Sequence, residues 1–224
     1  MKKKLHALVL GATGATGQEL VRQLLSNLNF DRVSIFTRKT FNVEHKKLVK
    51  NKIDFSKLTE YKNLVKGDIL FSALGTTLKE SGSKKQQYLV DYTYQYEFAK
   101  MASENGVTNY SLVSSTGAKE KSFFFYPKTK GALEESVKKL KFNKIQIFQP
   151  PMLIRPTELM REGEKVGIKV FKGLNKIGIL NSQKPLPVEY LAKKMISEAL
   201  LKRSDSITTF KSKDLFESMS FIWL

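Results

Sequence analysis

The fold of this chain is decided near its start, by the stretch Leu5-His6-Ala7-Leu8-Val9-Leu10-Gly11-Ala12-Thr13-Gly14-Ala15-Thr16-Gly17. A short apolar run, typical of a buried strand, ends in glycines spaced three residues apart, and an amphipathic helix follows. Glycines let the backbone turn sharply and bring its N–H groups close to phosphate oxygens, and the start of the helix adds unpaired donors and a partial positive charge. The stretch therefore predicts a site for a nucleotide pyrophosphate. The alternative is a tight strand-to-helix connection that holds no ligand.

The rest of the chain alternates between strand-like and helix-like segments. Further strands are expected near residues 32–36, 48–53, 68–74, 109–114 and 144–148, and further helices near 58–65, 84–105, 127–140 and 187–201. This alternation predicts a doubly wound α/β fold, in which one parallel sheet carries helices on both faces. Ligands of such sheets lie outside the carboxyl ends of the strands, so one crevice should be lined by the segments after Leu10, Phe36, Ala73, Val113 and Phe148.

A length of 224 residues suits a single domain. Residues 1–150 are expected to form the cofactor-binding core, and residues 151–224 a C-terminal segment on the substrate side that is not an independent domain. The tail after Arg203 is short and polar, and no element is predicted there. No apolar run is long enough to span a membrane, and the basic start with its apolar continuation is interpreted as the first strand rather than a signal peptide. A monomer and a homodimer both remain open.

The composition excludes several kinds of site. The chain has no cysteine, which excludes disulfides and thiol chemistry and is compatible with the cytoplasm, where we expect the protein to be located. His6 and His45 are the only histidines, and neither belongs to a cluster with metal-ligand spacing, so no metal site is expected. The net charge of +18 permits an acidic partner, but the lysines are scattered along the chain. We interpret them as a solvated basic surface rather than a specific nucleic-acid site.

The second informative motif is Tyr126-Pro127-Lys128-Thr129-Lys130. Tyr126 and Lys130 are four residues apart and share one face of the helix that they open, where Pro127 is tolerated because a first turn has spare N–H groups. A phenol has an ordinary pKa near ~10, and a lysine ammonium one turn away favours its ionised form. Such a pair can protonate a carbonyl oxygen as hydride arrives, or act as a base in the reverse step, while the lysine also holds a nicotinamide ribose.

A hydroxyl for the substrate oxygen is expected at the end of the preceding strand, in Leu112-Val113-Ser114-Ser115-Thr116-Gly117. Ser114, Ser115 and Thr116 are all candidates, and we favour Ser115, eleven residues before Tyr126. The aromatic run Phe123-Phe124-Phe125 directly precedes Tyr126. We interpret it as core or as a subunit contact; the alternative is a wall for an apolar substrate.

These motifs together resemble the short-chain dehydrogenase/reductase superfamily, which has a Rossmann-type fold, and most closely its atypical branch typified by the Tat-interacting oxidoreductases. The resemblance covers roughly residues 5–155 and rests on the glycine turn, Leu74-Gly75-Thr76-Thr77, Leu112 to Ala118, Tyr126 to Gly131, and Leu140-Lys141-Phe142. The spacing of Gly11, Gly14 and Gly17 departs from Gly-x-Gly-x-x-Gly and is the variant of the extended and atypical members. The resemblance implies that the cofactor is contacted by Thr13, Gly14, Ala15, Thr16, Arg38, Leu74, Gly75, Tyr126 and Lys130, and that Leu153 and Arg155 come near the nicotinamide.

NADP is expected rather than NAD. Folds that bind NAD place an Asp or Glu at the end of the second strand, where it accepts a hydrogen bond from the ribose 2′-hydroxyl. This chain has Thr37-Arg38-Lys39 there, and two cations suit a 2′-phosphate. The alternative is that Arg38 and Lys39 belong to the scattered positive surface. Asp54, after the third strand, is a candidate acceptor for the adenine amino group or a cap for the turn that follows.

The sequence thus predicts an NADP-dependent oxidoreductase that transfers hydride to or from a small carbonyl or alcohol, with Tyr126 as the acid/base, Lys130 beside it and Ser115 positioning the substrate oxygen. One alternative is a regulator or scaffold that binds NADP(H) without turnover. Another is an enzyme like the nucleoside-diphosphate-sugar epimerases and dehydratases, for which the region after residue 150 is short. The presence of both Tyr126 and Lys130 favours an enzyme over a pure sensor.

Overall fold

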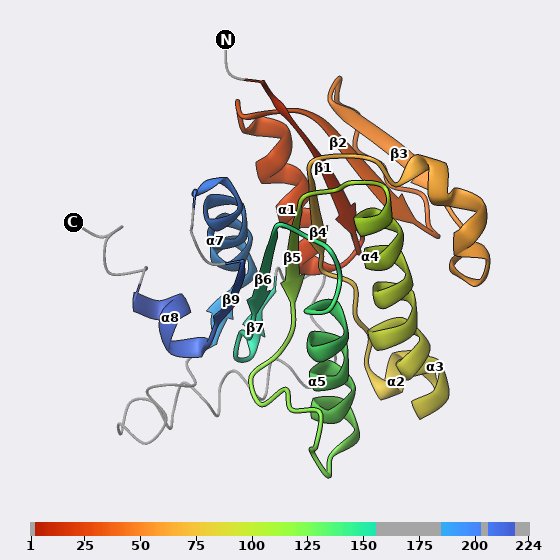
Figure 1. Cartoon of the computed structure of the whole chain (residues 1–224), viewed down its shortest axis with the longest axis vertical. Helices are drawn as coiled ribbons and strands as arrows, with labels where there is room; N and C mark the ends of the chain where they lie inside the picture. The colour runs from red at the N-terminus through yellow and green to blue at the C-terminus, as the bar shows by residue number, and fades with distance from the viewer. Residues whose placement is uncertain (1–2, 156–184, 203–205, 218–224) are drawn as a thin grey trace.

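The computed structural model of the chain describes residues 3–155, 185–202 and 206–217. Its centre is a seven-stranded sheet in the order β3-β2-β1-β4-β5-β6-β9 (Figure 1). The strands are β1 (Leu5–Leu10), β2 (Phe30–Thr37), β3 (Leu48–Lys52), β4 (Ile69–Ser72), β5 (Asn109–Val113), β6 (Lys144–Phe148) and β9 (Ile207–Phe210). All neighbouring strands are parallel, so their carboxyl ends share one edge, and the chain reverses its direction of winding between β1 and β4. Ligands of doubly wound folds bind at such a point.

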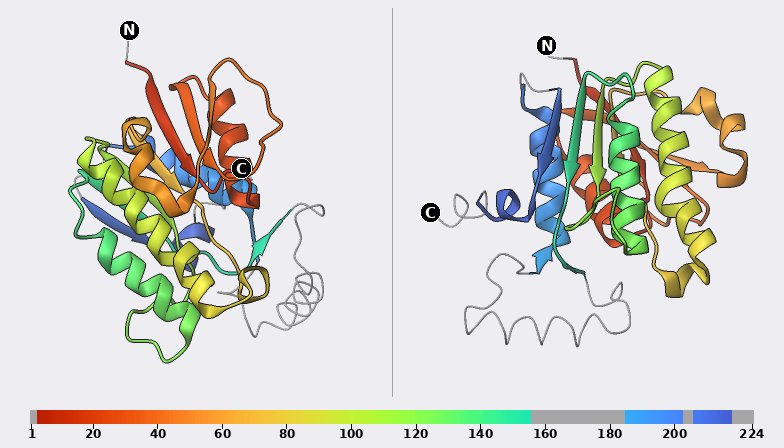
Figure 2. Two further views of the ribbon diagram at one scale, coloured as in Figure 1. Left: turned by 90° about the vertical axis from the view of Figure 1, so that its right-hand side faces the viewer. Right: turned by 60° about the horizontal axis from the view of Figure 1, so that its bottom comes forward.

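Helices cover both faces of the sheet (Figure 2). One face packs against α1 (Ala15–Ser26) and α7 (Val188–Leu200), and the other against α4 (Tyr94–Glu104), α5 (Phe125–Val137) and the 3₁₀ segment η1 (Phe55–Leu64). Side chains of β1 alternate between the two cores: Ala7 and Val9 belong to the first, Leu8 and Leu10 to the second. Burial on both faces explains why this strand is a continuous apolar run, and the predicted Rossmann-type fold is confirmed.

The prediction that no element follows Arg203 is wrong. β9 adds a strand beside β6, and α8 (Ser212–Glu217) follows it. The strand is four residues long, and its two central residues, Thr208 and Thr209, are polar. Such a segment carries too little apolar alternation to be recognised as a strand.

The single helix expected from Lys84 to Asn105 is also interrupted. A short α2 (Leu78–Ser81) comes first, and α3 (Lys84–Tyr88) continues into α4 through the π turn η2 (Leu89–Thr93). A π turn inserts an extra residue into the helical repeat, so the side chains that follow point in new directions, and such turns occur often at functional sites. The turn here carries Asp91, which is completely buried.

Beyond β6, two short parallel strands, β7 (Leu153–Ile154) and β8 (Leu186–Pro187), form a second, two-stranded sheet. Residues 156–184, which belong to the expected substrate-side segment, lie outside the described residues. Within the described ranges, no helix is both long and apolar enough to cross a membrane.

Candidate functional site

The turn between β1 and α1 contains one glycine that packing within the chain does not require. A Cβ on Gly11, whose φ is +86°, would lie 2.5 Å from the backbone nitrogen of Leu74, and one on Gly17 would lie 2.0 Å from the Gly11 carbonyl oxygen. A Cβ on Gly14 would meet only that same carbonyl oxygen, at an ordinary 3.5 Å. Gly14 is the N-cap of α1, and no side chain caps the helix there. Gly14 thus leaves the start of α1 without a side-chain cap, and a helix start of this kind fits a pyrophosphate.

One cavity joins this turn to the ends of the neighbouring strands. Its lining consists of Gly14, Ala15 and Thr16, Ala73 to Thr76 after β4, Val113 and Ser114 at the end of β5, Tyr126 and Lys130 of α5, and Leu153 and Arg155 beyond β6. Four of the five strand-end segments expected to share a crevice thus meet here. The fifth, after β2, does not: Lys39 lines a separate groove along α1 together with Thr13, and Ala15 lines both spaces.

Lys130 lies in this cavity as a buried cation with a buried partner. Its Nζ is 3.4 Å from Asp91 Oδ1, and the two side chains are 4% and 0% exposed. The same Oδ1 accepts a hydrogen bond of 3.1 Å from the backbone N–H of Thr76. Asp91 thereby links α5 to the loop after β4. The sequence predicts that this loop contacts the cofactor. Sequence reasoning missed Asp91, because nothing in its neighbourhood distinguishes it from a solvated helical residue.

Tyr126 stands at the edge of the cavity, with 40% of its surface exposed. The Lys130 ammonium lies 5.9 Å from the centroid of its ring, over the ring face. The two side chains therefore share one face of α5, with Pro127 in the first turn of the helix, as the motif predicts. A partly open phenol beside a buried ammonium is an arrangement that can exchange a proton with a bound molecule.

The serines at the end of β5 differ in their surroundings. Ser114 lines the cavity, and its hydroxyl donates a hydrogen bond to Glu134. Ser115, the residue favoured by sequence, does not line the cavity, and its Oγ is buried with no partner among the described residues. Thr116 is exposed, and its hydroxyl donates to the carbonyl oxygen of Gln149. Of the three candidate hydroxyl residues, Ser114 is therefore the one that lines the cavity.

The residues expected at the adenosine end are solvent-exposed. Arg38 follows β2 with its guanidinium carbon 6.0 Å from the centroid of the Phe55 ring. Neither Arg38 nor Lys39 forms an ion pair within the described part of the chain, so both charges can serve a ligand. Asp54 caps η1: one carboxylate oxygen accepts from the Ser56 backbone N–H at 2.8 Å and from its hydroxyl at 2.7 Å. These bonds hold the pKa of Asp54 below its usual value. The capping alternative for Asp54 is thus observed, and its contact with adenine stays a prediction.

The aromatic run before Tyr126 is not core. Phe123 and Phe124 are among the most exposed apolar side chains of the described residues, and Phe125, at the start of α5, is partly exposed. The core alternative is therefore wrong for Phe123 and Phe124. A subunit contact stays a prediction.

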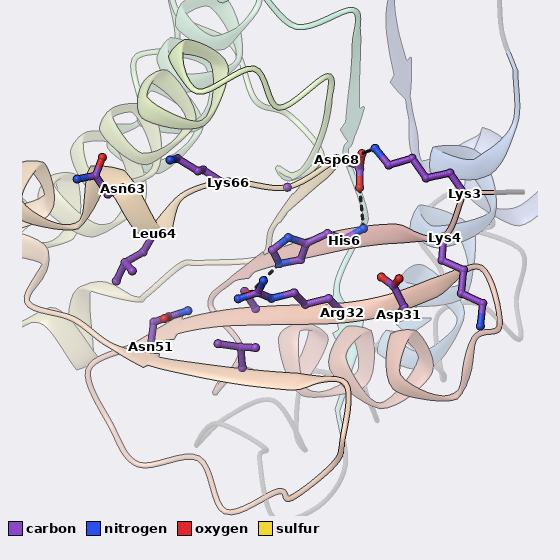
Figure 3. Close-up of a pocket in the computed structure, with 13 residues that line it drawn as sticks. Lys3, Lys4, His6, Asp31, Arg32, Asn51, Asn63, Leu64, Lys66 and Asp68 are labelled. Atoms are coloured by element: carbon purple, nitrogen blue, oxygen red, sulfur yellow. Dashed lines mark hydrogen bonds and ion pairs between the residues drawn. The ribbon is translucent and has the colours of Figure 1, made fainter.

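A second cavity lies toward the amino-terminal ends of β1, β2 and β4 (Figure 3). There the His6 backbone N–H donates to Asp68 at 2.8 Å, and the His6 ring nitrogen Nε2 is 2.8 Å from the Ser34 hydroxyl. Burial and the neighbouring Arg32 lower the pKa of His6. None of the residues that the sequence predicts for the site lines this cavity, so the candidate site is the one at the carboxyl ends.

A family model described as NAD(P)H-binding matches residues 11–146. The chain belongs to this family. HTATIP2 of Rattus norvegicus is 34% identical over 170 residues, which cover 74% of this chain and 70% of the relative. FMP52-1 of Scheffersomyces stipitis, which is named mitochondrial, is 32% identical over 192 residues, covering 84% and 80%.

Solved structures show the same fold at low identity. WbmG of Bordetella bronchiseptica in complex with NAD superposes with a TM-score of 0.70 at 10% identity, covering 100% of this chain and 80% of the other. A variant of ElxO with NADPH bound gives a TM-score of 0.66 at 16% identity, covering 96% and 100%. These similarities confirm that this chain has the Rossmann-type fold.

The expected cytoplasmic location is contradicted by these relatives. Several fungal relatives, including FMP52 of Candida albicans and of Kluyveromyces lactis, are named mitochondrial. The expectation rested on the absence of cysteine. The absence of cysteine excludes disulfides, but it does not distinguish between the cytoplasm and other compartments in which thiols stay reduced.

Proposed function

We propose that the chain is an NADP-dependent oxidoreductase that transfers hydride between the nicotinamide and a small carbonyl or alcohol. The observation that carries this proposal is the convergence of Tyr126 and Lys130 on the cavity that begins at Gly14, the N-cap of α1. A pyrophosphate held at that helix start would extend along the strand ends toward Lys130 and Tyr126. A nucleotide cofactor, when bound, supplies the hydride chemistry.

The residues of the chain would divide the remaining work. Lys130, fixed by Asp91, would donate hydrogen bonds to a ribose hydroxyl and hold its positive charge beside the Tyr126 ring. During reduction, the phenolic O–H of Tyr126 would donate its proton to the carbonyl oxygen of the substrate. During oxidation, the phenolic oxygen would accept the proton from the alcohol. Arg38 and Lys39, beyond the end of β2, would receive a 2′-phosphate.

Replacing Tyr126 tests this division of roles. Tyr126→Phe keeps the ring and removes only the hydroxyl, so NADPH affinity should stay within a few-fold of wild type. The rate of carbonyl reduction should fall by about 10²-fold or more, a typical size for acid–base catalysis. NADPH oxidation would be followed over a panel of small aldehydes, ketones and quinones, and any hit repeated with the variant. Tyr88→Phe is the matched control, because Tyr88 and Tyr126 are 39% and 40% exposed.

The same experiment separates the alternatives. A wild-type protein that binds NADPH but reduces nothing in a broad panel would favour the regulator or scaffold hypothesis. If a substrate is found and Tyr126→Phe reduces it as fast as the wild type, the proposed role of Tyr126 is wrong.

A further inference from the structure

A buried carboxylate lies one helical turn beyond Lys130. Glu134 of α5 is 5% exposed, and its side chain reaches the carboxyl ends of β5 and β6. There it accepts a hydrogen bond from the Ser114 hydroxyl and two from Gln149 Nε2, which lies 3.0 Å from each carboxylate oxygen. Within the described part of the chain, no lysine or arginine forms an ion pair with it. These donors therefore supply the hydrogen bonds that the buried carboxyl group needs.

The carboxylate determines which way the Ser114 hydroxyl points. A serine hydroxyl has one proton to donate and two lone pairs, whereas an ionised carboxylate can only accept. The Ser114 proton is therefore directed toward Glu134, away from the cavity that Ser114 lines. Toward a ligand, Ser114 can present only lone pairs.

We propose that Glu134 is a specificity-determining residue that makes Ser114 a hydrogen-bond acceptor for the substrate, and that the substrate carries a hydroxyl or N–H donor beside its reacting carbonyl. α-Hydroxy ketones and the vicinal diols formed by their reduction are the simplest such class. This inference rests on the proposed function. Tyr126 would protonate the carbonyl oxygen, while Ser114 would bind the neighbouring donor.

The hydrogen bonds around Glu134 predict what an isosteric amide would do there. Glu134→Gln keeps the shape but replaces one carboxylate oxygen with an NH₂ group. Gln149 Nε2 lies 3.0 Å from both carboxylate oxygens, whereas Ser114 reaches only Oε1, so in the variant Gln149 can donate only to the amide oxygen. With that oxygen at the Oε2 position, the NH₂ group faces Ser114. Ser114 would then accept from the amide, and its own proton would be free to point into the cavity. Ser114 would then donate a hydrogen bond to a ligand instead of accepting one.

The test compares hydroxyacetone with butanone, in which a methyl group replaces the hydroxyl. In wild type, kcat/KM for NADPH-dependent reduction should be at least about 10-fold higher for hydroxyacetone, because a polar site is left unpaired by the analogue that lacks the hydroxyl. Glu134→Gln should remove or reverse this ratio. Ser114→Ala should also abolish it, and this variant keeps the inference testable if Glu134→Gln does not fold. NADPH affinity should stay within a few-fold of wild type in both variants.

Glu135→Gln is the control, because Glu135 is the next residue of α5, lies farther out and pairs with Lys138 at 2.7 Å. It should leave the substrate ratio unchanged. A wild type that reduces other carbonyl compounds but shows no preference for hydroxyacetone would overturn the inference and leave the proposed function standing, as would a preference that survives Ser114→Ala. A wild type that reduces neither these ketones nor anything else in the panel would overturn both.

Discussion

Lys130 and Asp91 form an ion pair in the interior of the protein, with 3.4 Å between Nζ and Oδ1. Asp91→Ala should lower the free energy of unfolding by about 3–5 kcal/mol, because it leaves a buried ammonium without its partner. It also removes the acceptor of the Thr76 backbone N–H. Replacing both members with apolar residues of similar size, as Asp91→Leu with Lys130→Met, should cost much less. Chemical denaturation of the single and double variants measures the difference.

An exposed ion pair provides the control for this prediction. Lys62 Nζ lies 2.6 Å from Glu104 Oε2, but the two side chains are 48% and 43% exposed. Glu104→Ala should therefore change stability little, since exposed pairs gain little over their hydration. Equal losses in Asp91→Ala and Glu104→Ala would show that the buried pair does not hold α5 against the loop after β4.

Much of this site can be predicted from sequence, because its main motifs follow strands that are buried on both faces. Gly14, Tyr126 and Lys130 lie in segments whose neighbours have clear apolar periodicity, so their place at the carboxyl ends of the strands can be inferred. Asp91 could not be found in this way. It lies within the π turn η2, and such a turn has no sequence signal as strong as a glycine or a proline.

The serine assignment shows a second limit of sequence reasoning. Ser114 and Ser115 are adjacent at the end of a strand, and adjacent side chains of a strand point to opposite faces. An error of one residue in the predicted end of β5 is therefore enough to select Ser115, which does not line the cavity, in place of Ser114, which does. The partner that orients Ser114, Glu134, lies on a different element and is revealed only by packing.

Cofactor preference should depend on the cations beyond β2. NADPH should bind at least about 10-fold more tightly than NADH, which needs only about 1.4 kcal/mol and lies within the range of a charge-assisted phosphate contact. Arg38→Ala should remove most of this gap when both affinities are measured by calorimetry. Arg32→Ala is a matched control, because Arg32 is also exposed on β2 but lies at the cavity of Figure 3. Equal affinities of wild type for NADPH and NADH would contradict the prediction.

Stability should fall in mild acid because of His6. Burial, with a further contribution from Arg32, lowers the pKa of His6 below its ordinary value of 6.5, while Asp68 and Asp31 oppose the shift only in part. The unfolded chain therefore binds a proton at this residue more readily than the folded chain, and stability is lost as the pH falls below about 6.5. His6→Gln should reduce the difference in denaturation midpoint between pH 7.5 and pH 5.5. His45→Gln, at an exposed position, should leave that difference as in wild type.

Two glycines of the same turn should fail in different ways when alanine replaces them. A Cβ at position 17 would lie 2.0 Å from the Gly11 carbonyl oxygen, so Gly17→Ala forces the backbone apart and should cost about 1–3 kcal/mol of stability or more. Gly14→Ala meets only an ordinary 3.5 Å contact and should fold normally. Gly14 lines the cavity at the start of α1, where the pyrophosphate is proposed to bind, so an added methyl group there should lower NADPH affinity at least 10-fold, a change of about 1.4 kcal/mol. Thermal melting and NADPH fluorescence titration, carried out on both variants, separate the two effects. If Gly14→Ala binds NADPH as tightly as wild type, the pyrophosphate does not approach this helix start, and the cofactor pose proposed for the cavity is wrong.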